Sequence, residues 1–126
     1  MVKITLPGSI RSKKNSKRPC EVGGKFKKKR LILLPSKAYM AWENQARLSA
    51  AMQLIGMPIT DSPIHVCAMI YYKGQQPDLS GCLESVGDCL EGLVWVDDKQ
   101  IMSWDGSRLY HDLHNPRTEI TVEIIQ

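Results

Sequence analysis

The chain lacks the patterns that mark membrane-spanning and exported proteins. None of its apolar runs approaches the 18 residues of a membrane-spanning helix. Its basic N-terminal part is not followed by the apolar core of a signal peptide. We therefore expect neither membrane insertion nor export, and 126 residues suffice for a single domain over residues 1–126.

Paired cysteines are missing as well. No CxxC pair occurs among the four cysteines, which are Cys20, Cys67, Cys82 and Cys89. Scattered cysteines of this kind favour reduced thiols over a disulfide framework or a zinc site. We therefore expect a cytoplasmic protein.

Acidic residues are almost absent from the stretch between Arg11 and Arg30. It holds ten of the seventeen basic residues and a single acid, Glu21. Such a run is either a solvated tail or, because it lies between the apolar segments Val2–Leu6 and Leu31–Leu34, a loop that binds DNA phosphates. The candidate DNA contacts are Lys13, Lys14, Lys17, Arg18, Lys27, Lys28, Lys29 and Arg30.

Acid is gathered instead between Pro77 and Ile101, although the net charge of the chain is +4. The spacing of apolar residues predicts a helix from Leu79 to Gly92, then a short strand at Val94–Val96 and a turn. The acids of this stretch are Asp78, Glu84, Asp88, Glu91, Asp97 and Asp98.

Three of these acids share one face of the predicted helix, because Glu84, Asp88 and Glu91 follow one another at helical spacing. Like charges so placed repel by a few tenths of a kcal/mol per pair, and a cation removes the repulsion. Carboxylates from a strand end, a helix face and a turn thus predict a site for Mg²⁺ or Mn²⁺. The predicted metal ligands are Asp78, Glu84, Asp88, Asp97 and Asp98.

The remaining segments predict an α+β domain with a mixed sheet and two main helices. Strands are expected at Val2–Leu6, Ile64–Tyr72 and Arg117–Ile125, with a hairpin that turns at Asp105-Gly106 between segments 100–104 and 108–112.

A first helix is expected from Lys37 to about Leu54, with Ser36 as its N-cap. Tyr39 and Trp42 either belong to the core, as aromatics at helical spacing commonly do, or stack on bases. The face expected to be buried carries Ala38, Ala41, Trp42, Ala46, Leu48 and Met52.

The order of motifs between Pro77 and Ile101 resembles the RusA family of Holliday-junction resolvases, which are small phage and prophage endonucleases. The shared motifs are Pro-Asp-Leu, a helical Asp-x-Leu and Asp-Asp-x-Gln-Ile. The resemblance implies a RusA-like fold, Mg²⁺ dependence, a homodimer and a bacterial host cell. It also implies a catalytic set made of Asp78, Asp88 and Asp98, with Glu84 as a further carboxylate.

Three positions depart from the family pattern. Ser80 stands where a second Asp is usual, Gly81 where Asn is usual, and Glu84 where Lys is usual. Either Glu84 returns the missing carboxylate from one turn along, or the site is weakened. The role of the family Lys is vacant, and Lys73 or a residue of the basic loop is a candidate for it, which adds Lys73 to the predicted DNA contacts.

A metal-dependent endonuclease that resolves four-way DNA junctions by paired nicks accounts for both the acidic and the basic stretch. A two-fold symmetric substrate also implies a homodimer. The alternative is a catalytically decayed junction- or DNA-binding protein of the same fold. A structural or RNA-binding basic protein would leave the acidic stretch unexplained.

Overall fold

The computed structural model describes residues 1–12, 17–22 and 30–125, and a five-stranded mixed sheet lies at its centre. β4 (Ile64–Tyr72) pairs with β5 (Ile101–Ser103), β6 (Arg108–His111) and β7 (Arg117–Ile124), and β1 (Val2–Pro7) forms the other edge. β7 is antiparallel to both of its neighbours, whereas β5 and β6 run parallel to β4. The predicted α+β class with a mixed sheet is confirmed.

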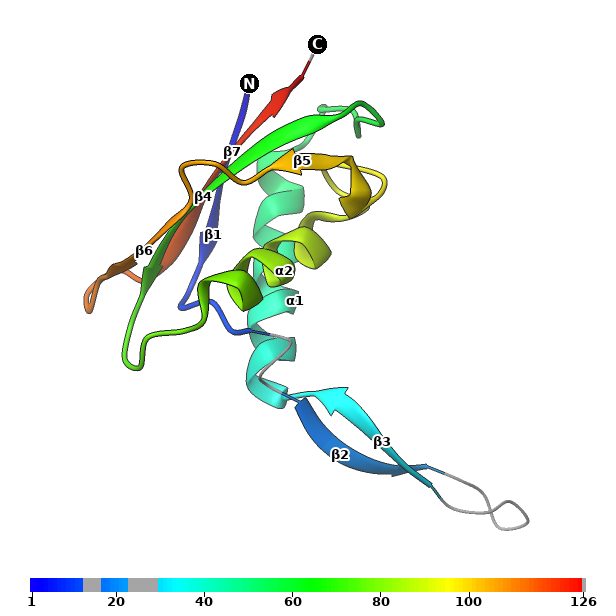
Figure 1. The fold of residues 1–126 in the computed structure, drawn as a ribbon, viewed down its shortest axis with the longest axis vertical. Coiled ribbons are helices and arrows are strands. Elements are labelled where there is room, and N and C mark those ends of the chain that lie inside the picture. The colour runs from blue at the N-terminus through cyan, green and yellow to red at the C-terminus, as the bar shows by residue number, and fades with distance from the viewer. Residues whose placement is uncertain (13–16, 23–29, 126) are drawn as a thin grey trace.

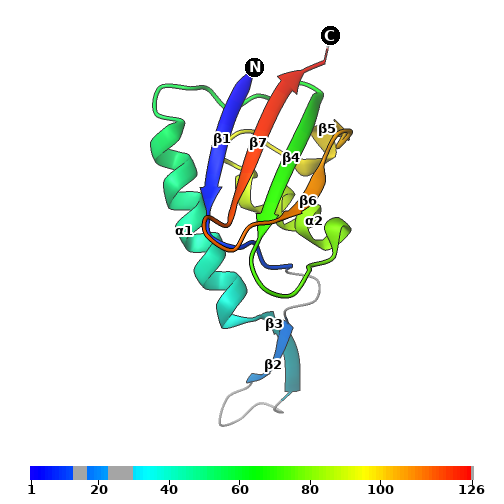
Figure 2. The same cartoon turned by 90° about the vertical axis from the view of Figure 1, so that its left-hand side faces the viewer.

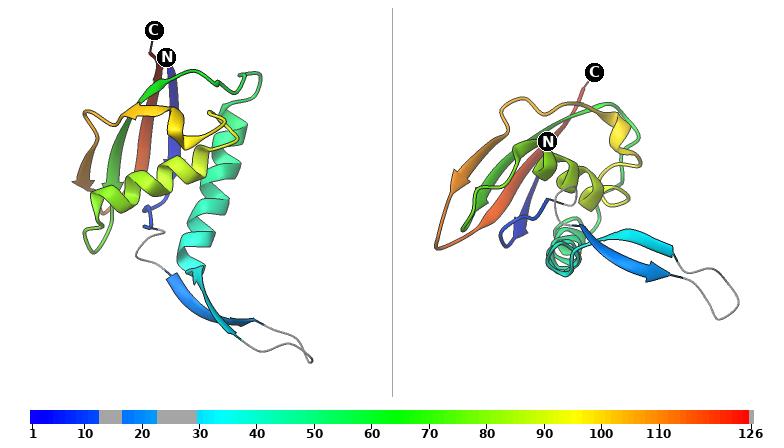
Figure 3. Two further views of the ribbon diagram at one scale, coloured as in Figure 1. Left: turned by 45° about the vertical axis from the view of Figure 1, so that its right-hand side comes forward. Right: turned by 60° about the horizontal axis from the view of Figure 1, so that its bottom comes forward.

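Both helices cover the same face of this sheet (Figure 2). α1 (Lys37–Gln53) packs against β1, and α2 (Leu79–Leu90) packs against α1. A separate antiparallel pair, β2 (Lys17–Val22) and β3 (Arg30–Pro35), extends away from the sheet (Figures 1 and 3). Within the described part of the chain, no helix is long and apolar enough to cross a membrane.

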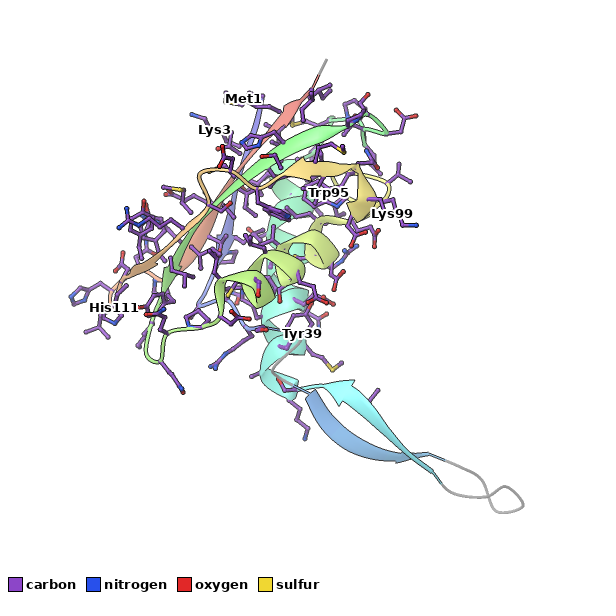
Figure 4. The ribbon with its side chains drawn as sticks, in the orientation of Figure 1. Met1, Lys3, Tyr39, Trp95, Lys99 and His111 are labelled. Atoms are coloured by element: carbon purple, nitrogen blue, oxygen red, sulfur yellow. The ribbon has the colours of Figure 1, made fainter. Side chains whose placement is uncertain are left out.

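The core fills the space between the covered face of the sheet and the helices. Alternate residues of β4 are fully buried, while those between them are half-buried, so β4 is central as its sequence predicts. Trp95 is the largest fully buried side chain and lies inside the domain, whereas Lys99 points outward (Figure 4). The sheet residues of the core are Ile4, Leu6, Ile64, Val66, Ala68, Ile70, Ile120 and Val122.

α1 begins as predicted, because Ser36 Oγ accepts a hydrogen bond from the backbone N–H of Tyr39 at 3.1 Å. Its predicted buried face is wrong in part, since Ala38 and Ala41 are exposed and Leu48 and Met52 are each 66% exposed. The stripe that does face the core places two aromatic rings near one end and alanines near the other, where close approach to the sheet requires small side chains. Its members are Tyr39, Trp42, Ala46 and Ala50, and the core assignment of both aromatics is confirmed.

The predicted hairpin between β5 and β6 is wrong. Both strands run along the same edge of β4 in the same direction, so they succeed one another and do not pair. The turn between them does form at Gly106, which has a φ of +89°. Ser107 Oγ accepts a hydrogen bond from Ala68 N–H at 2.9 Å, and so replaces a strand-to-strand bond that the interruption removes.

Two further expectations are corrected. The predicted strand Val94–Val96 is absent, because Trp95 forms only isolated bridges to Thr60 and Glu91. This segment winds tightly around the end of α2, where the N–H of Val94 bonds to Leu90 O at 2.9 Å. The basic stretch expected as a loop contains β2, which pairs with β3.

Candidate active site

Asp78 begins α2 and is the N-cap of that helix. Its Oδ2 accepts hydrogen bonds from Gly81 N–H at 3.3 Å and from Ser80 Oγ at 3.0 Å. Both bonds satisfy or orient groups at the helix N-terminus, where a negative charge is also favoured by the helix dipole. The carboxylate is therefore held in place by the start of the helix while remaining exposed.

The other end of α2 is fixed by an arginine of α1. Arg47 Nη1 donates to the backbone oxygens of Cys89 at 2.7 Å and Glu91 at 3.2 Å, which are among the carbonyls left without partners where a helix ends. Gly92, with a φ of +83°, then turns the chain back. These contacts set the direction in which Glu91 leaves the helix.

Gln100 shapes the turn that carries Asp97 and Asp98. Its Oε1 accepts the N–H groups of Val96 and Asp97 at 2.8 Å, and its Nε2 donates to the backbone oxygens of two residues near the start of β4 at 2.9 Å. Asp97 caps the following turn η1 (Asp98–Gln100) by accepting Lys99 N–H at 2.9 Å. The Gln of the Asp-Asp-x-Gln-Ile motif thus holds the turn that carries the two aspartates.

These two constructions bring three carboxylates together, here called the carboxylate cluster: Glu91, Asp97 and Asp98. One oxygen from each lies within 4.8 Å of the others. Glu91 Oε1 also accepts Asp98 N–H at 3.1 Å, which ties the helix end to the turn. Three carboxylates this close to one another are a group that could hold a divalent cation, because hard oxygen ligands suit such ions.

The electrostatics of the cluster also favour a cation. Desolvation, a hydrogen bond with Asp97 and the charges of Glu91, Asp97 and Asp88 all raise the pKa of Asp98. The backbone N–H of Lys99, followed by the hydrogen bond with Asp98, lowers the pKa of Asp97. Like charges are therefore held near one another, and a bound cation would relieve their repulsion.

A groove of about 350 Å³ runs alongside α2 from Ser80 to Asp98, and we call it the carboxylate groove. Ser80 and Glu84 face it from successive turns of α2, and Asp98 faces it from the η1 turn. The family position that usually carries the second Asp therefore faces the same space as Glu84. The lining residues are Ser80, Leu83, Glu84, Gly87, Asp98, Ile101 and Trp104.

A second groove, of about 340 Å³, adjoins the first end of α2, and we call it the basic groove. Arg11 and Lys73 line it together with Asp78. Ser9 joins its two walls, because Ser9 Oγ accepts Lys73 N–H at 3.1 Å. Its lining residues are Ser9, Ile10, Arg11, Ser12, Lys73, Gln75, Gln76, Pro77 and Asp78.

Asp78 links the two grooves. It lines the basic groove, and the hydroxyl bound to it belongs to Ser80, which lines the carboxylate groove. Ser85 adds a second link, because Ser85 Oγ donates to Arg11 O at 2.8 Å and so holds the start of the basic stretch against α2. The basic groove thus lies at the start of α2, next to the end of the carboxylate groove that Ser80 lines.

The departure at Gly81 has a packing cause. A Cβ at this position would overlap Ser12 Oγ and lie 3.1 Å from Ser12 Cβ, and Ser12 is only 7% exposed. The asparagine that is usual in the family does not fit while Ser12 stays where it is. Glycine here is therefore matched to the packing of Ser12 against α2.

Replacing Gly81 with alanine is expected to lower the free energy of unfolding by ~1–3 kcal/mol, the usual cost of overpacking. The double change Ser12→Gly with Gly81→Ala should recover most of that loss, because it removes both atoms that the new Cβ would meet. Gly87→Ala is the matched control, since its Cβ would lie 3.8 Å from the nearest atom and should cost nothing or gain up to ~1 kcal/mol of helix propensity. Urea unfolding measures all three, and equal stability of the two alanine variants would contradict the overlap.

The structure places the predicted catalytic and metal-binding residues in four positions. Asp97 and Asp98 lie in the carboxylate cluster, Glu84 lies along the carboxylate groove, and Asp78 lies where the grooves adjoin. Asp88 lies near the α1 interface as well as the cluster. The pKa of Tyr39 is raised by burial, by its hydrogen bond to Glu43 and the charge of Glu43, and then by the charge of Asp88. The charge of Asp88 also raises the pKa of Asp98.

Only some of the predicted DNA contacts lie in the part of the chain that the structure describes. Lys73 lines the basic groove. The backbones of Lys17, Arg18 and Arg30 lie in β2 and β3. The remaining candidates lie outside the described residues, and they are Lys13, Lys14, Lys27, Lys28 and Lys29.

Sequence reasoning missed two groups at the site. Arg11 was counted in the basic stretch without a role of its own, and only the sheet shows that it meets Lys73. Glu91 was placed on the acidic helix face but not among the metal ligands, although Gly92 directly after it signals that the helix ends there and turns toward Asp97-Asp98.

Cys67, Cys82 and Cys89 are free, in agreement with the expected reduced thiols. Burial raises the pKa of Cys82 and of Cys89 to about 12, so both remain protonated. A buried, protonated thiol is neither a nucleophile nor a metal ligand. The chemistry of the site therefore rests on oxygen and cationic groups.

Comparison with known proteins identifies a nuclease family that includes the region of the carboxylate cluster and groove. The family described as Endodeoxyribonuclease RusA matches residues 15–123, which include α2, the carboxylate cluster and all residues that line the carboxylate groove. No curated protein matches the chain at a significant level. Because the match covers nearly the whole chain, the protein belongs to the RusA family of endodeoxyribonucleases, the nucleases that resolve Holliday junctions.

Proposed function

We propose that this protein is a Mg²⁺-dependent, structure-selective endonuclease that nicks four-way DNA junctions symmetrically. The observation that carries the proposal is that the basic groove, lined by Asp78, and the carboxylate groove, lined by Ser80, lie on the two sides of the Ser80–Asp78 hydrogen bond. A phosphodiester backbone needs cations along its path and a cation-binding carboxylate site where it is cut. The two adjoining grooves offer both.

The roles follow from position. Asp98, with Asp97 and Glu91 beside it, would hold Mg²⁺, and Glu84 and Asp78 extend the same acidic line along α2. When bound, Mg²⁺ supplies a Lewis acid for the phosphate and lowers the pKa of a coordinated water. The protein's contribution is to keep the carboxylates fixed through the turn that Gln100 holds and the helix end that Arg47 holds.

Arg11 and Lys73 are the groups we assign to the phosphate backbone next to the scissile bond. Both line the basic groove, within reach of the Asp78 end of α2. This chain has Glu84 where the family usually has Lys, so we assign to a cation of the basic groove the role of stabilising the charge that develops on the phosphate. Lys73 is fixed by its backbone bond to Ser9, and we assign that role to it.

The substrate also implies an assembly and a place of action. Resolving a junction takes two nicks related by two-fold symmetry, so a homodimer supplies one site for each strand. The reduced thiols fit the cytoplasm, and the family relation points to a bacterial host cell carrying a phage or prophage.

The deciding experiment is nicking of a synthetic four-way junction. The unaltered protein should cut it with Mg²⁺, leave it intact in EDTA, and cut linear duplex of the same sequence far less. Binding of the junction without nicking in either Mg²⁺ or Mn²⁺ would instead establish a decayed centre with a DNA-binding role, for which Ser80, Gly81 and Glu84 are the altered positions.

The basic stretch gives a separate prediction about affinity. Replacing Lys27, Lys28, Lys29 and Arg30 together with alanine should weaken binding to every DNA sequence alike, because phosphate contacts do not read bases. The slope of log K against log salt should flatten by ~0.9 for each duplex phosphate contact that is lost. Fluorescence anisotropy at several salt concentrations measures this slope.

A control for that prediction is a lysine of the five-stranded sheet, on the face that the helices do not cover. Lys3 is exposed on β1, whose outward side is the one that the helices leave uncovered (Figures 2 and 4). Lys3→Ala should leave the salt slope unchanged. An unchanged slope in the fourfold variant as well would show that the basic stretch does not touch DNA.

A further inference from the structure

The carboxylate groove has an apolar wall that metal and phosphate do not need. Its charged members are Glu84 and Asp98, but Leu83, Ile101 and Trp104 line it as well. A phosphate and its cation gain nothing from apolar side chains. Apolar lining beside a few fixed polar groups suits a ligand that has both a charged and a flat apolar part, and a nucleotide is of that kind.

Trp104 is the aromatic member of this wall, and its position is firmly anchored. It follows β5 directly, and its backbone oxygen accepts Ser107 N–H at 3.0 Å, while Ser107 is itself bonded to β4 through Ala68. The side chain is half-buried, because it packs against the core and also lines the groove. A ring that is fixed and partly open is suited to stacking.

The size of the groove favours a single base. About 350 Å³ lies near the lower end of the ~300–1,000 Å³ range of small-ligand sites, and a duplex is too large for it. Gly87 contributes room, because a Cβ there would stand 3.8 Å from Asp98 Cβ and 4.0 Å from Ile101 Cδ1. A base can enter once it is unstacked, which costs least where stacking is already interrupted, as at a junction.

We propose that Trp104 stacks on a nucleobase next to the scissile phosphate and thereby helps to choose the site of nicking. The inference rests on the proposed function, since it places DNA in the carboxylate groove. Trp104 is a specificity-determining residue in this account, whereas the carboxylates and the basic groove perform the reaction. The ligand that Trp104 would contact is the base of an unpaired or unstacked deoxynucleotide.

Tryptophan fluorescence tests this directly because the three tryptophans differ in exposure. Trp42 is 5% exposed and Trp95 is fully buried, so only Trp104 can meet a ligand. In EDTA, where no DNA is cut, a single-stranded dodecamer should quench the fluorescence of the unaltered protein. An abasic dodecamer of the same length, which offers the same phosphates without bases, should not.

Two variants complete the binding test. Trp104→Phe should lose the quenching yet keep its affinity for the dodecamer, because phenylalanine still stacks and still packs on the core. Trp104→Leu should bind it roughly 5- to 150-fold more weakly, as expected for the loss of one base–aromatic stack. Quenching that persists in Trp104→Phe, or that the abasic strand produces equally, would overturn the inference.

Nicking adds a readout that a merely structural tryptophan would not move. On a set of junctions that differ only in the bases around the crossover, Trp104→Leu should cut with a flattened preference, while Trp104→Phe keeps the original one. An unchanged preference in Trp104→Leu refutes the role of Trp104 and leaves the nuclease standing. Absence of nicking in the unaltered protein refutes the proposed function, and the quenching result is still obtained.

Discussion

Asp78→Asn is expected to reduce nicking of a four-way junction by orders of magnitude while leaving the fold unchanged. Asparagine is as good an N-cap as aspartate, so the bonds to Gly81 and Ser80 at the start of α2 have a replacement acceptor. What the change removes is the negative charge at the point where the two grooves adjoin. A loss of activity without a loss of stability would therefore identify the charge, and not the cap, as the functional feature.

Junction binding by Asp78→Asn should survive and tighten. Removing a negative charge from a site that receives phosphate relieves a repulsion of about 332/(εr), which at ~4 Å amounts to one to a few kcal/mol for an effective dielectric constant of ~20 to 80. Anisotropy measures the binding and a gel assay measures the nicking. Asp78→Ala is the control, because it loses the cap as well and should cost about 1 kcal/mol of stability. Full activity in Asp78→Asn would remove Asp78 from the reaction.

Glu84→Gln is expected to be nearly as damaging as Asp78→Asn if Glu84 supplies the carboxylate missing at Ser80. The structure makes this exchange physically reasonable, since Ser80 and Glu84 line the same groove from successive turns of α2. Glutamine keeps the size of the side chain and its ability to accept hydrogen bonds but withdraws the charge that a cation needs. Nicking rates at saturating Mg²⁺ for the two variants give the comparison.

The reciprocal change sharpens this test. Ser80→Asp with Glu84→Lys restores the usual family residues at both positions and should cut at least as well as the unaltered chain. Glu84→Lys alone should be inactive, because it places a cation in the groove without returning a carboxylate. If Glu84→Gln cuts normally, the exchange hypothesis fails, and Asp78 with the carboxylate cluster must suffice.

Local physics accounts for what could be predicted from the sequence alone. Alternating apolar residues place Ile64–Tyr72 as a central strand, and the spacing after Asp78 places α2 to within two residues of its end, because both patterns depend on neighbours along the chain. The gathering of acid near Asp97-Asp98, the excess of base before β3 and the RusA family relation are also properties of the linear order. They are sufficient for the class of fold and the class of enzyme.

Tertiary structure decided which of these residues meet. Arg11 and Lys73 are far apart in the sequence, and only the contact between the segments after β1 and after β4 places them in one groove. Glu91 joins Asp97 and Asp98 because Arg47 of α1 fixes the end of α2. β5 and β6 share one edge of β4, and Trp104, which lies between them, lines the same groove as Glu84 and Asp98. These facts depend on packing between distant segments, and local pattern carries no information about it.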